Sequence, residues 1–207
     1  HKQNMINVEQ DGIRYYQFEL LQGRITHGIF ARHGGVSQPP WASLNAGGTV
    51  GDDPNHVSEN RQRILGVIGR NQESVFDVWQ VHSSDVVITS QPRSRGSPHI
   101  RADGILTSKP GITLMMRFAD CVPIFLYDPE HQVAGIAHAG WKGTAKGIAS
   151  VIVTKMVDQF HSNPEQILAG IGPSIGPDHY EVGLNVFNQV RSTFGEVASI
   201  FFVKKNG

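Results

Sequence analysis

The single cysteine of the sequence, Cys121, stands just before an apolar stretch, and His138 stands just after a second one. Residues 122–127 and 133–137 are predicted to be buried strands, and Asp128-Pro129-Glu130 between them has the composition of a turn. If the two strands form a hairpin, the thiol and the imidazole lie at the same end of it. A thiol beside an imidazole is a pair of groups from which a nucleophilic or a metal-binding site can be built.

A third residue with suitable chemistry, His82, follows another predicted strand at 75–81. Two imidazoles and one thiolate that converge from separate strand ends would give three protein ligands and one open position, as in catalytic zinc sites. Zinc in such a site lowers the pKa of a bound water toward neutrality. The same residues without a metal would suit a Cys–His nucleophile with a lowered thiol pKa. The residues alone leave both possibilities open, and in both His82, Cys121 and His138 are the predicted catalytic residues.

Two further residues are predicted to contact a substrate. Arg32 opens an Arg-His-Gly-Gly turn directly after a predicted strand at 25–31, where a fixed guanidinium could bind an anion. An exposed arginine on an ordinary Gly-Gly turn is an equally consistent interpretation. Asn45 lies in the loop that follows, and its side chain is a candidate hydrogen-bonding group for a substrate.

The composition indicates a compact globular chain without a general affinity for polyanions. Hydrophobic residues make up 39% of the 207 residues and charged residues 17%, which argues against disorder. The net charge is zero and no Lys/Arg run occurs, so nucleic acid and anionic membranes are not expected partners. No apolar run reaches the length of a membrane span, no signal peptide is evident, and one cysteine fits a reducing compartment. We therefore expect a cytoplasmic protein.

The expected elements alternate between helix and strand. Asp53 as N-cap and Pro54 at the first helical position start a helix that Gly69 ends. A second helix is expected to start directly after Gly143, and a third to stop at Gly195. The remaining predicted strands are 15–20 (as an edge strand), 86–89, 105–106, 112–116, 167–171 and 199–203.

Several common motifs are absent from the sequence. The glycines of residues 170–176 are spaced wrongly for a dinucleotide-binding loop, and no phosphate-binding Walker loop or HExxH zinc motif occurs. The ten histidines are scattered, and no His-x-His pair is present. This spacing opposes a multicopper site, which needs clustered imidazoles.

Eight short motifs, taken together and in this order, resemble the YfiH/YlmD family, whose domain is also labelled multicopper polyphenol oxidase or laccase. The resemblance covers roughly residues 25–185. The motifs are Ala31–Ser37, Ser43–Asn45, Val50–Asp53, Gln80–His82, Ala102–Gly104, Ala119–Pro123, His138–Thr144 and Gly172–Pro177.

The resemblance implies an α/β (α+β) fold with mixed sheets in a four-layer α/β/β/α arrangement, similar to that of cysteine hydrolases. It implies Zn²⁺ at the positions of His82, Cys121 and His138, with copper as the less favoured metal. The implied activity is phosphorolysis of adenosine, inosine and methylthioadenosine to free base and ribose 1-phosphate, together with adenosine deamination. The expected partners are therefore purine nucleosides and phosphate.

The sequence departs from the family pattern at two places. Family members continue past the position of Gly207, so we expect a single domain over residues 1–207 from which a C-terminal segment of the family is missing. Asp178-His179 stands where relatives can carry cysteines, which leaves the role of that loop open. The oligomeric state is also open.

Three other functions remain as alternatives. The first is a metal-free Cys–His hydrolase or deamidase built on the same three residues. The second is a copper polyphenol oxidase, which the family label suggests and the histidine spacing opposes. The third is a binding module whose metal is structural.

Overall fold

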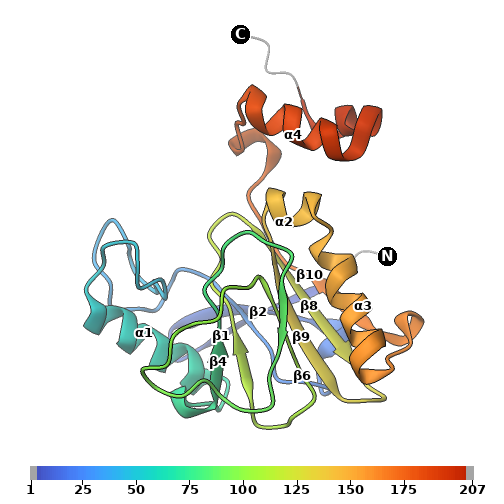
Figure 1. The fold of residues 1–207 in the computed structure, drawn as a ribbon. Helices are drawn as coiled ribbons and strands as arrows, with labels where there is room; N and C mark the ends of the chain where they lie inside the picture. The colour runs from blue at the N-terminus through green and yellow to red at the C-terminus, as the bar shows by residue number, and fades with distance from the viewer. Residues whose placement is uncertain (1–3, 204–207) are drawn as a thin grey trace.

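The protein is described here by a computed structural model, in which residues 4–203 are placed and form a mixed α/β fold (Figure 1). Its largest sheet has five strands in the order β10-β8-β9-β6-β5. Neighbours in this sheet pair antiparallel except β5 and β6, which are parallel. The predicted mixed α/β class is therefore confirmed. The strands are β5 (Val86–Ile88), β6 (Gly104–Thr107), β8 (Val122–Asp128), β9 (Val133–Ala139) and β10 (Leu168–Ile171).

Two smaller sheets complete the strand content of the described residues. One contains β1 (Met5–Gln10), β2 (Ile13–Phe18) and β3 (Ile29–Phe30) in that order. The strand predicted at 15–20 corresponds to β2, but its predicted edge position was wrong, because β2 pairs on both sides. The other sheet pairs β4 (Val75–Asp77) with β7 (Thr113–Met115) in parallel.

Two predicted strands are much shorter in the structure. The strand expected at 25–31 is reduced to Ile29–Phe30, and the one expected at 75–81 ends at Asp77. The side chain of Asp77 is buried and bonded to two arginines, at 2.7 Å from Arg93 and 3.0 Å from Arg117. After Asp77 the chain leaves this pairing, and Trp79 forms an isolated parallel bridge with Arg101.

The helices are α1 (Pro54–Val67), α2 (Trp141–Ala145), α3 (Ile148–Phe160) and α4 (Leu184–Phe194). The predicted start of α1 is confirmed, since the Asp53 carboxylate accepts a hydrogen bond from the Asn55 N–H at 2.8 Å. The prediction of one helix starting after Gly143 was wrong. The short helix α2 begins earlier, at Trp141, and Gly147 in the left-handed region (φ 74°) separates it from α3.

Helix α3 covers one face of the five-stranded sheet (Figure 1). Its residues Ile148, Ile152 and Met156 are fully buried against β6, β8 and β9, at the spacing that places side chains on one face of a helix. The opposite face of the sheet packs on the β4–β7 pair through Ile105 and Ile136. Helix α1 packs on the three-stranded sheet. Within residues 4–203, none of the helices combines the length and the apolar character that a membrane span requires.

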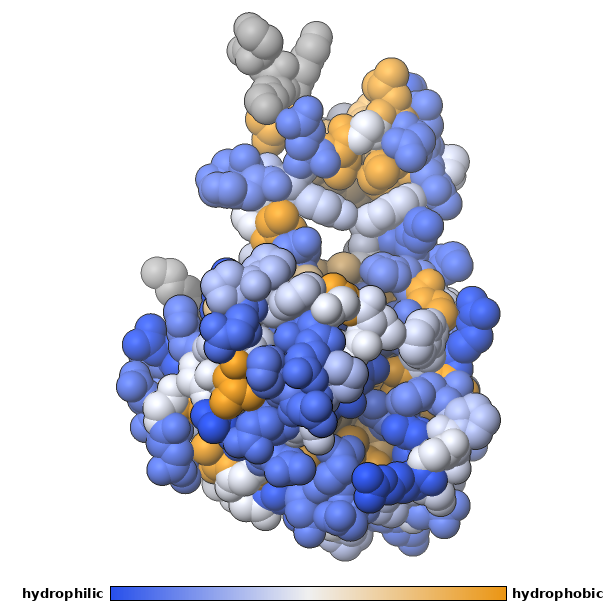
Figure 2. Space-filling model, turned by 90° about the vertical axis from the view of Figure 1, so that its left-hand side faces the viewer, coloured by the Kyte–Doolittle hydropathy of each residue, from blue (hydrophilic) through white to orange (hydrophobic). Residues whose placement is uncertain are grey.

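Helix α4 and the 3₁₀ helix after it, η5 (Gly195–Phe201), form a unit that stands apart from the body of the molecule (Figures 1 and 2). The prediction of a strand at 199–203 was wrong, because η5 occupies most of this segment. Its aromatic residues pair locally: Phe194 lies against Phe201 and Phe187 against Phe202, with ring centroids 5.4 and 5.0 Å apart. The other 3₁₀ helices are η1 (Glu19–Leu21), η2 (Gln72–Ser74), η3 (Pro164–Gln166) and η4 (Pro177–His179).

Candidate metal centre

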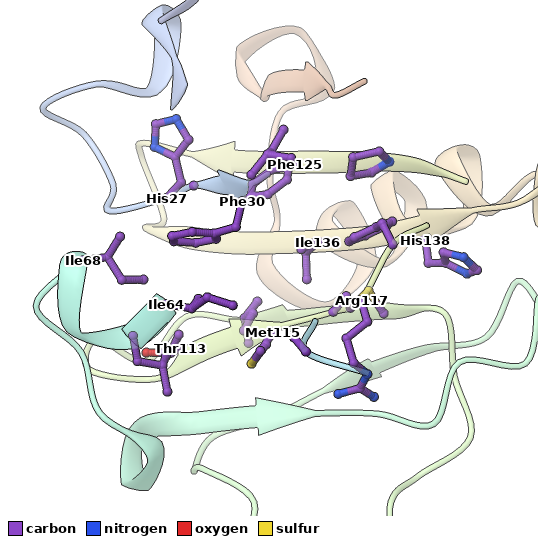
Figure 3. A pocket seen from close by; sticks show the side chains of 18 of the residues that line it. His27, Phe30, Ile64, Ile68, Thr113, Met115, Arg117, Phe125, Ile136 and His138 are labelled. Carbon is purple, nitrogen blue, oxygen red and sulfur yellow. The ribbon is translucent and has the colours of Figure 1, made fainter. Parts of the chain in front are cut away.

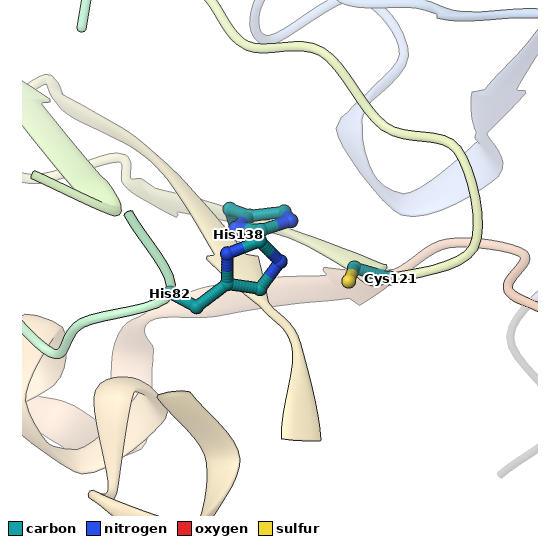
Figure 4. A group of neighbouring side chains, drawn as sticks. All are labelled: His82, Cys121 and His138. Atoms are coloured by element: carbon teal, nitrogen blue, oxygen red, sulfur yellow. The ribbon is translucent and has the colours of Figure 1, made fainter. Parts of the chain in front are cut away.

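The three predicted ligand residues lie together at one end of the β8–β9 hairpin (Figure 4). One ligand atom from each of His82, Cys121 and His138 lies within 4.8 Å of the other two. The antiparallel register pairs Pro123 with His138, which places Cys121 beside the end of β9. The rings of His82 and His138 meet edge to face, with centroids 4.8 Å apart. His138 is buried, Cys121 is half-buried and His82 is exposed, so the group has one open side.

A buried carboxylate, Asp103, holds both histidines in place. Its Oδ1 accepts from His138 Nδ1 at 2.8 Å and from the backbone N–H of His82 at 3.0 Å. Its Oδ2 accepts from the N–H groups of Val81 and Ser83 and from the Ser83 hydroxyl. A carboxylate can only accept, so the proton of His138 sits on Nδ1 and the lone pair on Nε2. This carboxylate–histidine arrangement is the usual support of a metal-ligating imidazole.

The charges around the site favour a metal over a free thiolate. Burial lowers the pKa of His138 and the nearby His82 lowers it further; together they outweigh the raising effect of Asp103, so the neutral, metal-binding imidazole is favoured. Burial also raises the pKa of the Cys121 thiol, and the negative charges of Asp120 and Asp103 raise it further. A thiol in these surroundings is poorly activated as a nucleophile by itself, whereas coordination to a cation deprotonates a thiol outright.

The hydrogen bonds of Asp103 also set its own charge. Burial alone would raise the pKa of this carboxyl, but the bonds from Ser83, His138 and Val81 outweigh burial and hold the pKa below its usual value. Asp103 therefore stays ionised at neutral pH. Its negative charge is in contact with His138, which would offset part of the positive charge of a bound cation.

The backbone at Gly140 lies directly against two of the ligand residues. A Cβ at this position would stand 2.8 Å from His82 Cδ2 and 3.0 Å from Cys121 Sγ. Gly140 has an ordinary negative φ of −71°, so the close approach, and not the backbone conformation, requires glycine here. The backbone at Gly140 therefore leaves just enough space for the His82 imidazole and the Cys121 thiol.

We expect Gly140→Ala to displace His82 and Cys121 and to weaken metal binding by more than about 10-fold, the size of effect seen when the supports of metal ligands are removed. The measurement is the dissociation constant for zinc by competition with a chelator. Gly66→Ala is the matched control, because a Cβ at Gly66 in α1 meets nothing within 4 Å. A zinc affinity of Gly140→Ala within two-fold of the wild type would show that the absence of a side chain at Gly140 is not needed to position the ligand residues.

A large cavity of about 1420 Å³ opens next to the three ligand residues (Figure 3). It is larger than a typical small-molecule site of roughly 300–1,000 Å³. Figure 3 shows Ile136 and His138 of β9 on one side of the cavity and Ile64 and Ile68 of α1 on another. Most of the labelled wall is apolar. All five predicted site residues line this cavity: Arg32, Asn45, His82, Cys121 and His138.

The polar groups of Arg32 and Asn45 are engaged within their own loop. Arg32 donates to the Ala42 carbonyl from Nε at 2.9 Å and from Nη2 at 2.5 Å. Asn45 donates to Asp52 Oδ2 at 2.9 Å and accepts from the Gly47 N–H at 2.9 Å. Both side chains therefore stabilise the loop that borders the cavity, and their contacts with a substrate stay predictions.

Sequence reasoning gave no role to Asp103, which shapes the site through its hydrogen bonds. The signal for Asp103 was an acidic residue between Ala102 and Gly104, directly before a buried strand, where a charge needs partners. The aromatic ring of Phe118 was also missed, and its centroid lies 5.5 Å from that of His138.

The loop after β10 lies beside the ligand residues. The Ile175 N–H donates to the Asp120 carbonyl at 3.1 Å, next to Cys121. Burial raises the pKa of Tyr180, and the negative charges of Cys121 and Asp120 raise it further, so its hydroxyl stays protonated. Asp178 and His179 form an exposed pair at 3.2 Å. The geometry thus places the loop near the site and assigns no role to the Asp178-His179 pair.

Residues 26–207 match the family model described as multi-copper polyphenol oxidoreductase laccase, and the relatives found by sequence carry the names YlmD and YfiH. The chain belongs to the YlmD/YfiH family. Purine nucleoside phosphorylase YlmD of Geobacillus stearothermophilus is 39% identical over 172 residues, which cover 80% of this chain and 63% of that relative. Purine nucleoside phosphorylase YfiH of Escherichia coli is 38% identical over 177 residues, 84% of this chain and 68% of the relative.

Solved structures of the YlmD/YfiH family have the same fold. The crystal structure of YlmD from Geobacillus stearothermophilus superimposes with a TM-score of 0.82 at 35% identity, covering 91% of this chain and 72% of that one. The crystal structure of Bacillus licheniformis YfiH gives a TM-score of 0.83 at 32% identity, covering 95% and 75%. The chain spans less than two thirds of the length of the Geobacillus relative that it matches by sequence.

Proposed function

We propose that this chain provides the active site of a zinc-dependent purine nucleoside phosphorylase that also deaminates adenosine. The observation that carries the proposal is the convergence of His82, Cys121 and His138 at the wall of a cavity large enough for a nucleoside. The names of the YlmD and YfiH relatives support the reaction class. The proposed substrates are adenosine, inosine and methylthioadenosine with phosphate, and the products are the free base and ribose 1-phosphate.

The donor set fits zinc better than the alternatives. Two imidazoles and one thiolate are ligands that zinc prefers, and three protein ligands leave a fourth position for water or substrate. His138 offers Nε2 because Asp103 occupies Nδ1. When bound, zinc would act as a Lewis acid and lower the pKa of a water molecule held in the open position.

The residues of the chain would bind and orient the two reactants. In phosphorolysis a phosphate oxygen attacks the anomeric carbon of the ribose while the bond to the purine nitrogen breaks. Arg32 at the cavity wall is the proposed phosphate contact, and its bonds to the Ala42 carbonyl use Nε and Nη2, which leaves Nη1 as the donor proposed for the phosphate. Asn45 is proposed to contact ribose or base. The apolar wall around Phe30 and Phe125 would exclude water and accommodate a methylthio group.

The remaining parts of the proposal follow the resemblance to the family. They are a four-layer α/β/β/α arrangement similar to that of cysteine hydrolases, a single domain over residues 1–207, and a cytoplasmic location. The proposed partners are small molecules, without nucleic acid or membrane. The packing of α3 and α1 on different sheets is compatible with this layering.

The test is to incubate the purified, zinc-loaded protein with adenosine and phosphate and to separate the products by chromatography. We expect adenine and ribose 1-phosphate, together with inosine and hypoxanthine from deamination. Omitting phosphate should stop release of both bases and leave the formation of inosine. Absence of all products from a protein that contains one zinc ion per chain would refute the proposal.

The site geometry opposes the two alternative reactions. A metal-free Cys–His hydrolase needs a lowered thiol pKa, whereas the surroundings of Cys121 raise it. A multicopper oxidase needs several adjoining metal sites. Among residues 4–203, His82, Cys121 and His138 are the single group of three or more His, Cys, Asp or Glu side chains close enough to hold a metal ion.

A further inference from the structure

The loops that carry His82 and Cys121 both leave the small parallel sheet of β4 and β7. Backbone pairing in this sheet ends with Asp77 opposite Met115. Beyond that pair, one segment runs on to His82 and the other to Cys121. The spacing of the two ligands therefore depends on what holds these segments side by side after the ladder has stopped.

Beyond the last backbone pair of this sheet, the side chain of Gln80 connects the two segments. Its Oε1 accepts from the backbone N–H of Arg117 at 2.9 Å, and its Nε2 donates to the Arg117 carbonyl at 2.8 Å. A primary amide can make this pair of bonds because it carries an acceptor and a donor side by side. A carboxylate of the same shape could make only the first of the two bonds. Gln80 thus reproduces with its side chain the pairing that backbone provides within a sheet.

The side chain of Arg117 reinforces the same connection from the other segment. Its Nη2 donates to the Val78 carbonyl at 3.0 Å, and its Nη1 bonds to Asp77 Oδ2 at 3.0 Å. The segment 77–80 and Arg117 are therefore joined at both ends by hydrogen bonds. Because the Arg117 guanidinium holds 77 and 78, Gln80 is the contact nearest to the ligand loops.

Gln80 completes a set of connections among all three ligand residues. Asp103 joins the His82 loop to His138, through the backbone N–H groups on one side and Nδ1 on the other. Gln80 joins the His82 loop to the segment that leads through Phe118 to Cys121. Metal–ligand bonds to imidazole and thiolate have narrow ranges near 2.0–2.1 and 2.3 Å, so a small change in loop spacing costs affinity.

We propose that Gln80 is a positioning residue that fixes the separation of His82 and Cys121 and thereby sets the metal affinity of the site. This inference rests on the proposed function, since it assumes that the two residues share a metal ion. Gln80 also lines the cavity, but in this role it acts through the backbone of Arg117. Its effect is specific to the amide, because both the donor and the acceptor are used.

The test measures cobalt(II) binding to metal-free protein, with the thiolate-to-cobalt absorption band as the readout. We expect Gln80→Ala and Gln80→Glu to weaken cobalt binding by about 10–100-fold, the range for residues that support metal ligands, and to change the intensity of the band. Far-UV circular dichroism should be unchanged. The matched controls are Gln62→Ala and Gln62→Glu on the exposed side of α1, which should bind cobalt as the wild type does.

A double-mutant cycle separates positioning from general destabilisation. In a His82→Ala background there is no pair of ligands left to space, so Gln80→Ala should reduce the remaining cobalt affinity less than two-fold. Equal affinity and an equal absorption band in Gln80→Ala and the wild type would overturn the inference while leaving the proposed function intact. An undiminished effect in the His82→Ala background, or loss of the native circular dichroism in both Gln80 variants, would also overturn it. A wild-type protein that binds no cobalt would refute the proposed metal centre, and this inference with it.

Discussion

Cys121→Ser is expected to lose the bound metal and the turnover of nucleosides together. The hydroxyl that replaces the thiol is a hard, protonated group, and the two imidazoles alone bind zinc weakly. We expect zinc content after dialysis to fall from about one ion per chain to a small fraction, and turnover to fall by more than about 100-fold. The measurements are elemental analysis and the nucleoside assay on the same preparation.

Asp120→Asn is the control for this change. Its side chain is exposed beside Cys121, and removal of its charge makes deprotonation of the thiol easier. The variant should keep its zinc. Removal of zinc with a chelator should abolish wild-type turnover, and added zinc should restore it. A Cys121→Ser protein that still turns over adenosine would rule out this role for the thiol, and a metal-free wild type with full activity would favour the Cys–His hydrolase.

Asp103→Ala is expected to reduce both the stability of the fold and the order of the site. The fully buried carboxylate accepts hydrogen bonds from the Val81, His82 and Ser83 N–H groups and from His138, and alanine leaves these donors unpaired. Loss of one partner in such a buried network costs about 3–5 kcal/mol of unfolding free energy. Chemical denaturation of the metal-free proteins measures it.

The control for Asp103→Ala is Asp85→Ala, in which an exposed carboxylate of the same loop is removed. Its unfolding free energy should stay within about 0.5 kcal/mol of the wild type. Asp103→Asn keeps the shape but turns one acceptor into a donor that faces other donors, so a smaller loss of about 1–3 kcal/mol is expected. If Asp103→Ala lost no more unfolding free energy than Asp85→Ala, the hydrogen bonds of the Asp103 carboxylate would not stabilise the fold.

The same network gives a pH dependence with a defined sign. The pKa of Asp103 is lower in the folded protein than in the unfolded chain, so its contribution is full above the unfolded pKa of about 3.9 and is lost as the pH falls through the folded value. The stability difference between wild type and Asp103→Asn should therefore shrink on acidification. A difference that grows toward low pH would contradict the low pKa.

The part of the site on the hairpin was predictable because its signals are local. The turn residues Asp128 to Glu130 fix the ends of β8 and β9, and a strand end then places Cys121 and His138. The approach of His82 was inferred with less support, because it depends on contacts between sheets. Asp103 was missed as a support because three of its five hydrogen-bond donors are backbone N–H groups, which residue types along the sequence do not reveal.

The errors in the predicted fold have a common origin in tertiary contacts. The apolar run from Ser199 reads as a strand, but no sheet edge meets it and its aromatic rings pair with α4. The strand at 75–81 reads as continuous, but the backbone changes its partner after Asp77, and Trp79 forms a bridge with Arg101. The periodicity of apolar residues predicts which side chains share a buried face, but it does not predict which other element packs against that face.

The positions of the ligand residues on different sheets affect the order of folding and metal binding. Cys121 and His138 lie at one end of the β8–β9 hairpin of the large sheet, whereas His82 lies in the loop that connects β4 of the small sheet to β5 of the large one. In a newly made chain whose sheets have not yet packed together, the three ligand residues are not yet close to one another. If zinc is the metal, as proposed, its binding should therefore be a late event in folding.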